Sequence, residues 1–181
     1  MACNILSCIS KGCENNAGGL LKFYVADAES VTGTTLTDGT ITAIETSGST
    51  SGSTVPVFYE FEFNKNSASF VETGNIDLAN GSTFYTVETT LNIARREVAK
   101  RNAIQLLGAG QRDLLVIVKD ANGLYWLQGL TNYANLTAVG EGSGLAKADG
   151  SKYSLTLTSE EPDMMPEVDS SIIADLLVAC I

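Results

Sequence analysis

Residues 114–129 constrain the fold most, because they have the pattern of a complete β-hairpin. Residues 114–119 predict a buried strand, because 114–118 form a continuous apolar run of suitable length and β-branched content before Lys119. Turn-forming residues follow, and we expect Asn122 and Gly123 to supply the positive φ angles of a tight turn. Residues 124–129 then predict the return strand, so the chain is expected to be rich in antiparallel sheet.

Most of the remaining sequence also predicts strands. In residues 58–63 the polar and apolar side chains alternate, which places Phe61 and Phe63 on one face and Glu60 and Glu62 on the other. The strand expected at residues 84–91 is long enough to extend beyond a compact sheet. Similar patterns predict strands at residues 20–25, 40–45, 68–72, 135–139 and 153–158.

One segment, residues 94–107, predicts a helix. It is rich in helix formers, ends before a glycine and holds four of the 11 basic residues. On a helical projection, Ile104 and Leu107 fall on the same side as Arg96 and Lys100. Either the second half of this helix is buried all round, or a neighbouring subunit covers its charged side. A helix that lies across its own sheet with a solvated basic flank fits equally well.

With 181 residues, the chain has the length of a single domain. We divide it into a cysteine-containing N-terminal arm (1–19), one β-barrel or β-sandwich domain with one flanking helix (20–159), and a C-terminal arm (160–181). The C-terminal arm is first acidic and then apolar, and its apolar part is too short to span a bilayer. We expect it to dock on a neighbouring subunit; the alternative is that it folds onto its own domain.

Charge and composition exclude several functions. The net charge of −10 disfavours tight binding of nucleic acid or of an anionic membrane. The charge is segregated, because residues 94–119 carry six basic and two acidic side chains and therefore leave −14 for the rest. The absence of histidine removes the commonest general base and zinc ligand.

The remaining chemical groups do not predict a catalytic or metal site. Glu60 and Glu62 would lie about 7 Å apart on one strand, but nothing in the sequence separates their pKa values as a pair of catalytic acids requires. The cysteines at positions 3, 8, 13 and 180 lack the short spacing of zinc sites. We expect free thiols, and the alternative is that some of them form disulfides. We therefore expect no cofactor, no metal and no enzymatic activity.

The order of long strand, basic helix, hairpin and threonine-rich strands resembles that of virion structural proteins of tailed bacteriophages. The likeness is greatest to tail-tube-like or ring-forming proteins of phages that infect Bacteroidetes, including the crAss-like group, and it covers about residues 20–168. The residues that carry it are Lys119, Asp120, Asn122-Gly123, Tyr125-Trp126, Gly129, Leu136-Thr137, Tyr153, Leu155-Thr156-Leu157-Thr158 and Glu161-Pro162.

This resemblance implies a small β-barrel or β-sandwich that assembles into hexameric rings, which stack into a tail tube or form a head–tail connector. The implied partners are other copies of the chain, other virion proteins, and DNA as transiting cargo that is not bound specifically; no membrane is involved. The implied location is the virion, assembled in the host cytoplasm. Joining strands from several copies into one larger barrel would remove exposed sheet edges, and an acidic bore would let DNA pass without sticking.

From the helix and the C-terminal arm we select candidate subunit-interface residues. They are Arg96, Lys100, Ile104, Leu107, Ile172, Ile173, Leu176 and Leu177. Three alternatives stay open: a capsid decoration protein, a secreted adhesin or surface-layer β-domain, and an enzyme that uses Glu60 or Glu62.

Overall fold

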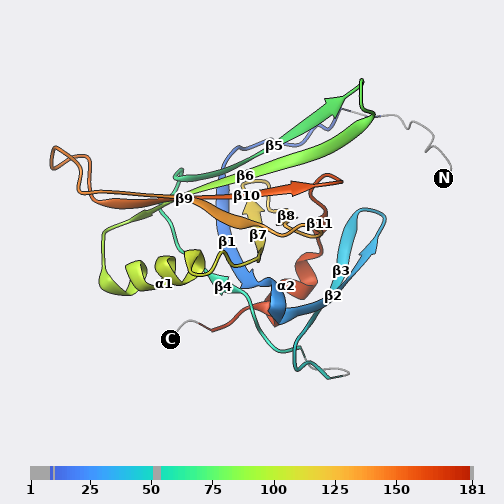
Figure 1. The fold of residues 1–181 in the computed structure, drawn as a ribbon, viewed down its shortest axis with the longest axis horizontal. Coiled ribbons are helices and arrows are strands. Elements are labelled where there is room, and N and C mark those ends of the chain that lie inside the picture. The colour runs from blue at the N-terminus through green and yellow to red at the C-terminus, as the bar shows by residue number, and fades with distance from the viewer. Residues whose placement is uncertain (1–8, 10, 51–53, 180–181) are drawn as a thin grey trace.

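The computed structural model describes residue 9, residues 11–50 and residues 54–179, and the fold is mainly β, as the sequence predicts. Eleven strands form two sheets, with two α-helices and one short 3-10 helix, and neither sheet closes into a barrel within this described part (Figure 1). The helices are α1 (Val98–Gly108), α2 (Ser170–Leu176) and η1 (Ala28–Ser30).

The larger sheet has seven strands in the order β2-β3-β11-β8-β7-β1-β4. Strand β11 joins the β2–β3 hairpin to the rest of this sheet, because it pairs in parallel with β3 and antiparallel with β8. The seven strands are β1 (Leu20–Asp27), β2 (Val31–Thr37), β3 (Thr40–Thr46), β4 (Tyr59–Glu60), β7 (Leu114–Asp120), β8 (Tyr125–Gln128) and β11 (Glu167–Val168).

The smaller sheet has four antiparallel strands in the order β5-β6-β10-β9 and lies across the top of the view in Figure 1. Its two hairpins project at opposite ends: β5–β6 at upper right and β9–β10 at left. The strands are β5 (Ala68–Asp77), β6 (Ser82–Ala94), β9 (Asn135–Gly142) and β10 (Lys152–Glu161).

The larger sheet is buried on both faces at its strands β1 and β7. Between the two sheets lies a first core, to which β1 contributes Phe23 and Val25 and the smaller sheet contributes Val87 and Leu155. Behind the larger sheet lies a second core, which α2 covers. Its members are Tyr24, Ala26, Ile41, Ile44, Phe58, Leu115, Ile117, Leu127, Val168, Ile173 and Leu176.

Strand β7 explains why the hairpin sequence has no polar–apolar alternation. Leu114, Val116 and Val118 point into the first core, whereas Leu115 and Ile117 point into the second. A strand that is buried on both faces needs an apolar residue at every position. The predicted hairpin is therefore confirmed as β7 and β8.

The turn of this hairpin differs from the expectation. Gly123 takes a positive φ of 94°, but Asn122 does not. Instead, the Asp120 carboxylate accepts hydrogen bonds from the backbone N–H groups of Asn122 (2.9 Å) and Leu124 (3.0 Å), and from the indole N–H of Trp126 (3.2 Å). A side-chain-stabilised loop of this kind replaces the tight two-residue turn.

Other segments also differ from the sequence predictions. Helix α1 begins at Val98 rather than at residue 94, because Ala94 still belongs to β6. A second helix, α2, forms within the segment predicted to be an arm. The strand expected at residues 58–63 is reduced to the two residues of β4. Strand β2 was not predicted, since it is threonine-rich and mostly exposed, and so lacks a strong apolar pattern.

A buried polar link joins the two sheets across the first core. The Gln128 side chain donates to the carbonyl oxygens of Val87 (3.1 Å) and Leu157 (3.4 Å), and it accepts a hydrogen bond from the Thr89 hydroxyl (2.7 Å). Thr89 and Gln128 are both fully buried. By contrast, the buried hydroxyl of Ser159, on β10 of the smaller sheet, has no hydrogen-bond partner.

These two buried hydroxyls predict opposite effects on stability. Replacing Thr89 by valine leaves the Gln128 carbonyl without its donor, so we expect the free energy of unfolding to fall by about 1–3 kcal/mol. Replacing Ser159 by alanine removes an unpaired hydroxyl, so we expect no loss or a small gain. Urea denaturation of the two variants measures both changes. Equal losses in the two variants would contradict a specific role for the link between the sheets.

Candidate assembly surfaces

The outward face of the smaller sheet is covered mainly by hydroxyl and amide side chains. Along β6 and β10, buried residues alternate with partly exposed ones, so every second side chain points away from the first core. In register across the sheet, Thr90 pairs with Thr156 and Asn92 with Ser154. The outward positions are Ser69, Val71, Thr73, Thr86, Glu88, Thr90, Asn92, Asn135, Ala138, Gly140, Ser154, Thr156, Thr158 and Glu160.

The charge on this face is negative. Glu88 and Glu160 supply two carboxylates, and Lys152, which pairs with Ala94 and is in phase with the outward positions of β10, supplies one ammonium. Lys152, at the start of β10, lies at the end of the sheet next to the β6–α1 corner. A broad surface of hydroxyls and carboxylates with one lysine at its end offers few cationic contacts to phosphate groups. Sequence analysis predicts an acidic bore in general terms but does not identify Glu88 and Glu160.

Both edges of the smaller sheet are long. Strand β5 has ten residues and β9 has eight, and neither pairs with a further strand in the described part of the chain. Natural proteins usually protect such edges with lysine, proline or very short strands. Neither β5 nor β9 contains lysine or proline, and Val71 and Val139 are 59% and 50% exposed on them. Their protection is limited to one register shift between β9 and β10 and to Glu72, which points to the inner side of β5. These edges are therefore suited to pairing with another chain.

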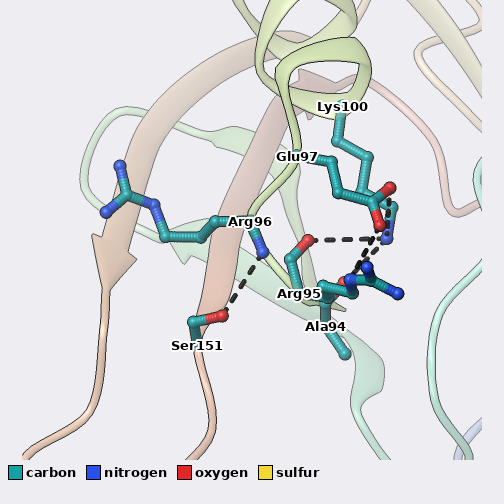
Figure 2. A network of polar contacts seen from close by, with 6 residues as sticks. All are labelled: Ala94, Arg95, Arg96, Glu97, Lys100 and Ser151. Atoms are coloured by element: carbon teal, nitrogen blue, oxygen red, sulfur yellow. Dashed lines mark hydrogen bonds and ion pairs between the residues drawn. The ribbon is translucent and has the colours of Figure 1, made fainter.

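Figure 2 shows the polar contacts that hold residues 94–100 in place where β6 passes into α1. Arg95 has a left-handed φ of 63°, and its backbone N–H donates to the Ser151 carbonyl oxygen at 2.8 Å. The Lys100 ammonium donates to the carbonyl oxygens of Ala94 (2.9 Å) and Arg95 (3.4 Å) and lies 3.5 Å from the Glu97 carboxylate. Much of the bonding capacity of Lys100 is thus used inside its own chain.

The Arg96 side chain points away from this network (Figure 2). Its guanidinium carbon lies 5.7 Å from the centre of the Tyr153 ring, at cation–π distance. Its backbone N–H donates to the Ser151 hydroxyl at 3.3 Å. Arg96 remains exposed, so its expected contact with a neighbouring subunit stays a prediction.

Helix α1 packs through the side that the sequence assigns to its charged residues. Ile104 is buried and Leu107 is half-buried against the first core. Val98 and Leu106, which lie across from Arg96 and Lys100 on the helical projection, are 73% and 58% exposed. The helix therefore covers its own sheet with Ile104 and Leu107 and presents an uncovered apolar face to solvent.

A groove of about 680 Å³ runs between α1 and the β1–β4 edge of the larger sheet. On the α1 side it is lined by Ala99, Lys100, Ala103, Ile104, Leu106 and Leu107. Tyr59 and Phe61 form part of the opposite wall, and Arg112 lies at the rim in an ion pair with Asp27 at 2.7 Å. Because most of the lining is apolar, this groove could accept apolar side chains.

The carboxylates considered for catalysis lie at this groove but are not arranged as a catalytic pair. Glu60 forms an ion pair with Lys22, and this hydrogen bond raises the pKa of the lysine ammonium. Glu62 is exposed beyond the end of β4. The strand that would have aligned the two carboxylates on one face ends at Glu60.

The C-terminal interface candidates lie within the chain's own second core. Ile173 and Leu176 are buried there, and Ile172 and Leu177 pack partly against it. These four side chains therefore pack against the chain's own domain, which is the alternative to docking on a neighbouring subunit. The Asp169 carboxylate starts α2 by accepting a hydrogen bond from the Ser171 N–H at 2.8 Å, and this contact lowers the pKa of Asp169.

The described residues hold no group of three or more cysteine or carboxylate side chains that could bind a metal ion. Cys13 is exposed and unpaired, whereas Cys3, Cys8 and Cys180 lie outside the described residues. Among the helices described, none is long and apolar enough to cross a membrane.

Glu161 is the most deeply buried carboxylate and holds a loop in place. It is 5% exposed and accepts hydrogen bonds from the backbone N–H groups of Thr131 (3.0 Å) and Asn132 (3.3 Å). Burial raises its pKa, although these two hydrogen bonds act in the opposite direction. Its role in the fold is to anchor the connection between β8 and β9.

Comparisons of the chain with protein-family models, with curated protein sequences and with solved structures give no significant match.

The raised pKa of Glu161 predicts how stability depends on pH. The folded state binds the Glu161 carboxyl proton more tightly than the unfolded state does. The protonated carboxyl therefore adds its full contribution to the free energy of unfolding below the ordinary pKa of 4.5, and this contribution is lost as the pH rises through the raised pKa. We expect the Glu161→Gln variant, which cannot ionise, to become progressively more stable than the natural protein over this interval. Urea denaturation at several pH values measures the difference.

The control for this experiment is Glu160→Gln, which changes the exposed neighbour on the same strand and should show no such trend. If the difference for Glu161→Gln stayed constant or shrank as the pH rose, the hydrogen bonds from Thr131 and Asn132 would outweigh the cost of burial.

Proposed function

We propose that this chain is a non-enzymatic virion structural protein that assembles into rings, which form a phage tail tube or a head–tail connector through which DNA passes. One observation carries the proposal: the smaller sheet combines two long unprotected edges with an outward face of hydroxyls and carboxylates. In a ring, the edges would serve association and the face would line the channel.

The edges support the first part of this proposal. In a ring, β5 of one copy pairs with β9 of the next, and repeated pairing leaves no free edge in the closed barrel. The contact is heterologous, because two different edges meet, and such contacts generate rings when the rotation closes. Hexameric symmetry follows from the phage resemblance and is part of the proposal.

The outward face supports the second part. DNA that moves through a channel must not be held by phosphate contacts, and each lysine or arginine on the wall would add such a contact. The Glu88 and Glu160 carboxylates repel phosphate, while the threonine and serine hydroxyls keep the wall hydrated. Lys152 lies at the end of this face, and four of the 11 basic residues lie outside it, at the β6–α1 corner and on α1.

Charged edge residues should block ring formation. We expect Val71→Lys on β5 and Val139→Lys on β9 each to abolish rings, because a lysine on either edge opposes strand pairing. Negative-stain electron microscopy of the purified proteins at equal concentration measures the fraction of particles in rings. Both residues are at least half exposed, so folding should be preserved.

The matched control is Leu36→Lys. Leu36 is 51% exposed on β2, which is an edge strand of the larger sheet. Its replacement should leave rings intact. A natural protein that stays a monodisperse monomer at high concentration, or rings that survive both valine substitutions, would contradict the proposal.

Reversing the charge of the outward face should make the assembly retain DNA. We expect the double variant Glu88→Lys, Glu160→Lys to bind double-stranded DNA at low salt and to release it steeply as salt rises, whereas the natural protein should not bind. Gel-shift titration measures both. The control Glu29→Lys, Glu45→Lys makes the same change in net charge at exposed sites on η1 and β3 and should bind far less. Equal DNA binding by control and double variant would argue against a channel-lining role.

A further inference from the structure

A pocket of about 580 Å³ lies where β10 ends, between the β2–β3 hairpin and the connection that leads to β11. Its lining includes the buried side chain of Leu127 and the half-buried side chain of Leu130. Leu36 and Met164 also line it and are 51% and 60% exposed. Large apolar side chains that stay exposed beside a pocket are typical of a surface that binds a partner.

The pocket is also acidic. Glu161 and Asp163 line it, and no lysine or arginine of the described chain does. Four more carboxylates lie next to lining residues in the sequence or are hydrogen-bonded to one: Asp38, Glu72, Glu160 and Glu167. A partner that matches this pocket must therefore bring both an apolar group and a positive charge.

The tip of the β9–β10 hairpin carries both groups. Leu145 is fully exposed there, and the exposed Lys147 makes no hydrogen bond or ion pair within the described chain. Asp149, the only acidic residue of positions 142–151, is used inside the turn. Its carboxylate accepts hydrogen bonds from the backbone N–H groups of Leu145 (2.9 Å) and Ala146 (2.7 Å). A tip that is already ordered loses little conformational entropy when it binds.

The two ends of the molecule differ in charge in the same sense. The hairpin adjoins the β6–α1 corner, because Lys152 pairs with Ala94. Together, residues 94–101 and 141–152 hold six basic and three acidic side chains, so this end is net positive even after its own ion pairs are counted. Residues 160–169, at the pocket, hold five acidic side chains and no basic one. The opposite ends of two copies therefore attract each other.

The tip and the pocket lie at the two ends of one strand. Strand β10 begins beside the hairpin tip and ends at Glu161 of the pocket, and its ten residues span about 30 Å. Figure 1 shows the β9–β10 hairpin at far left, and the end of β10 and the β2–β3 hairpin at right. A tip therefore cannot enter the pocket of its own chain, but copies displaced along β10 can repeat the contact from one molecule to the next.

We propose that the β9–β10 tip of one copy docks into the pocket at the end of β10 in a second copy. Leu145 contacts Leu36 and Met164, and the Lys147 ammonium pairs with the Asp163 carboxylate. Within the proposed function, on which this reading of the contact rests, the contact stacks one ring on the next, because the strands of a closed barrel run from one rim to the other. Sideways closure of a ring through β5 and β9 is a separate contact.

Exchanging the two charges tests the pairing. We expect Lys147→Glu and Asp163→Lys each to lower the fraction of stacked rings several-fold at low salt, as measured by sedimentation velocity and electron microscopy. The double variant Lys147→Glu, Asp163→Lys should restore stacking, because the acidic tip of one copy then meets a basic residue at the pocket of the next. The controls Lys65→Glu and Glu29→Lys change the charge equally at exposed residues that line neither surface, so stacking should not change.

Disulfide trapping between two different variants tests the contact without requiring rings. Both variants carry serine in place of the four natural cysteines; one adds Leu145→Cys and the other adds Leu36→Cys. We expect mild oxidation of the mixture to give a covalent heterodimer at several times the yield from a control mixture in which Leu78→Cys replaces Leu145→Cys. Leu78 is a suitable control because it is 92% exposed on the turn of the other projecting hairpin. The charge exchange keeps the natural cysteines, so it decides the question if the serine variants do not fold.

The two proposals fail in different ways. If the natural protein formed no rings but the Leu145–Leu36 heterodimer still formed above control, the ring proposal would fall and the docking contact would stand. If the single charge variants stacked normally, if the double variant stayed unstacked, or if the heterodimer yield matched the Leu78 control, the docking proposal would be overturned. In that case the pocket has another occupant, such as residues 1–13 or a different protein.

Discussion

Strand β7 is buried on both faces, and the rest of the fold depends on that arrangement. Leu114, Val116 and Val118 need a cover on one side, which the smaller sheet provides. Leu115 and Ile117 need a cover on the other side, which α2 and the segment around Phe58 provide. Because every residue of a doubly buried strand must be matched by packing, one short apolar run fixes a layered architecture of sheet, sheet and helix.

The same packing leaves the smaller sheet with unequal faces. Its inner face is held to the larger sheet by apolar contacts and by the buried Gln128 link, so its orientation is fixed. Its outer face and its two edges have no comparable partner within the described chain. The side of the molecule that is free to meet other copies is therefore also the side with the longest strands and the most uniform polar surface, and this coincidence supports an assembly role.

The sequence predicts the strands well wherever alternation or a continuous apolar run is strong, as in β6, β7 and β10. It predicts the helix but not the face through which it packs, because Ile104 and Leu107 are buried by a neighbouring sheet that the helical projection cannot represent. It misses α2, since a seven-residue helix with an aspartate cap has too little periodicity to stand out. Local patterns specify elements, whereas partners distant in sequence decide which faces are covered.

The candidate surfaces were only partly accessible to sequence reasoning. Arg96 and Lys100 were selected for their charge, but the carbonyl oxygens that hold Lys100 become visible only once β6 and α1 meet at a corner. In the sequence, Ile76 and Leu78 look like part of an ordinary turn. Their exposure on a projecting hairpin becomes visible only once it is known where β10 ends. A run of threonines at alternate positions is the one signal that could have identified the outward face beforehand.

Strand β11 has a consequence for the time course of folding in the cell. The β2–β3 hairpin ends at Thr46, yet it joins its sheet only through Glu167 and Val168. At a synthesis rate of about 5–20 residues per second, roughly 6–25 s separate the two events on the ribosome. During this interval the second core lacks β11 and α2, and the nascent chain carries an incomplete larger sheet. Such a chain would need chaperone protection until β11 and α2 have been synthesised.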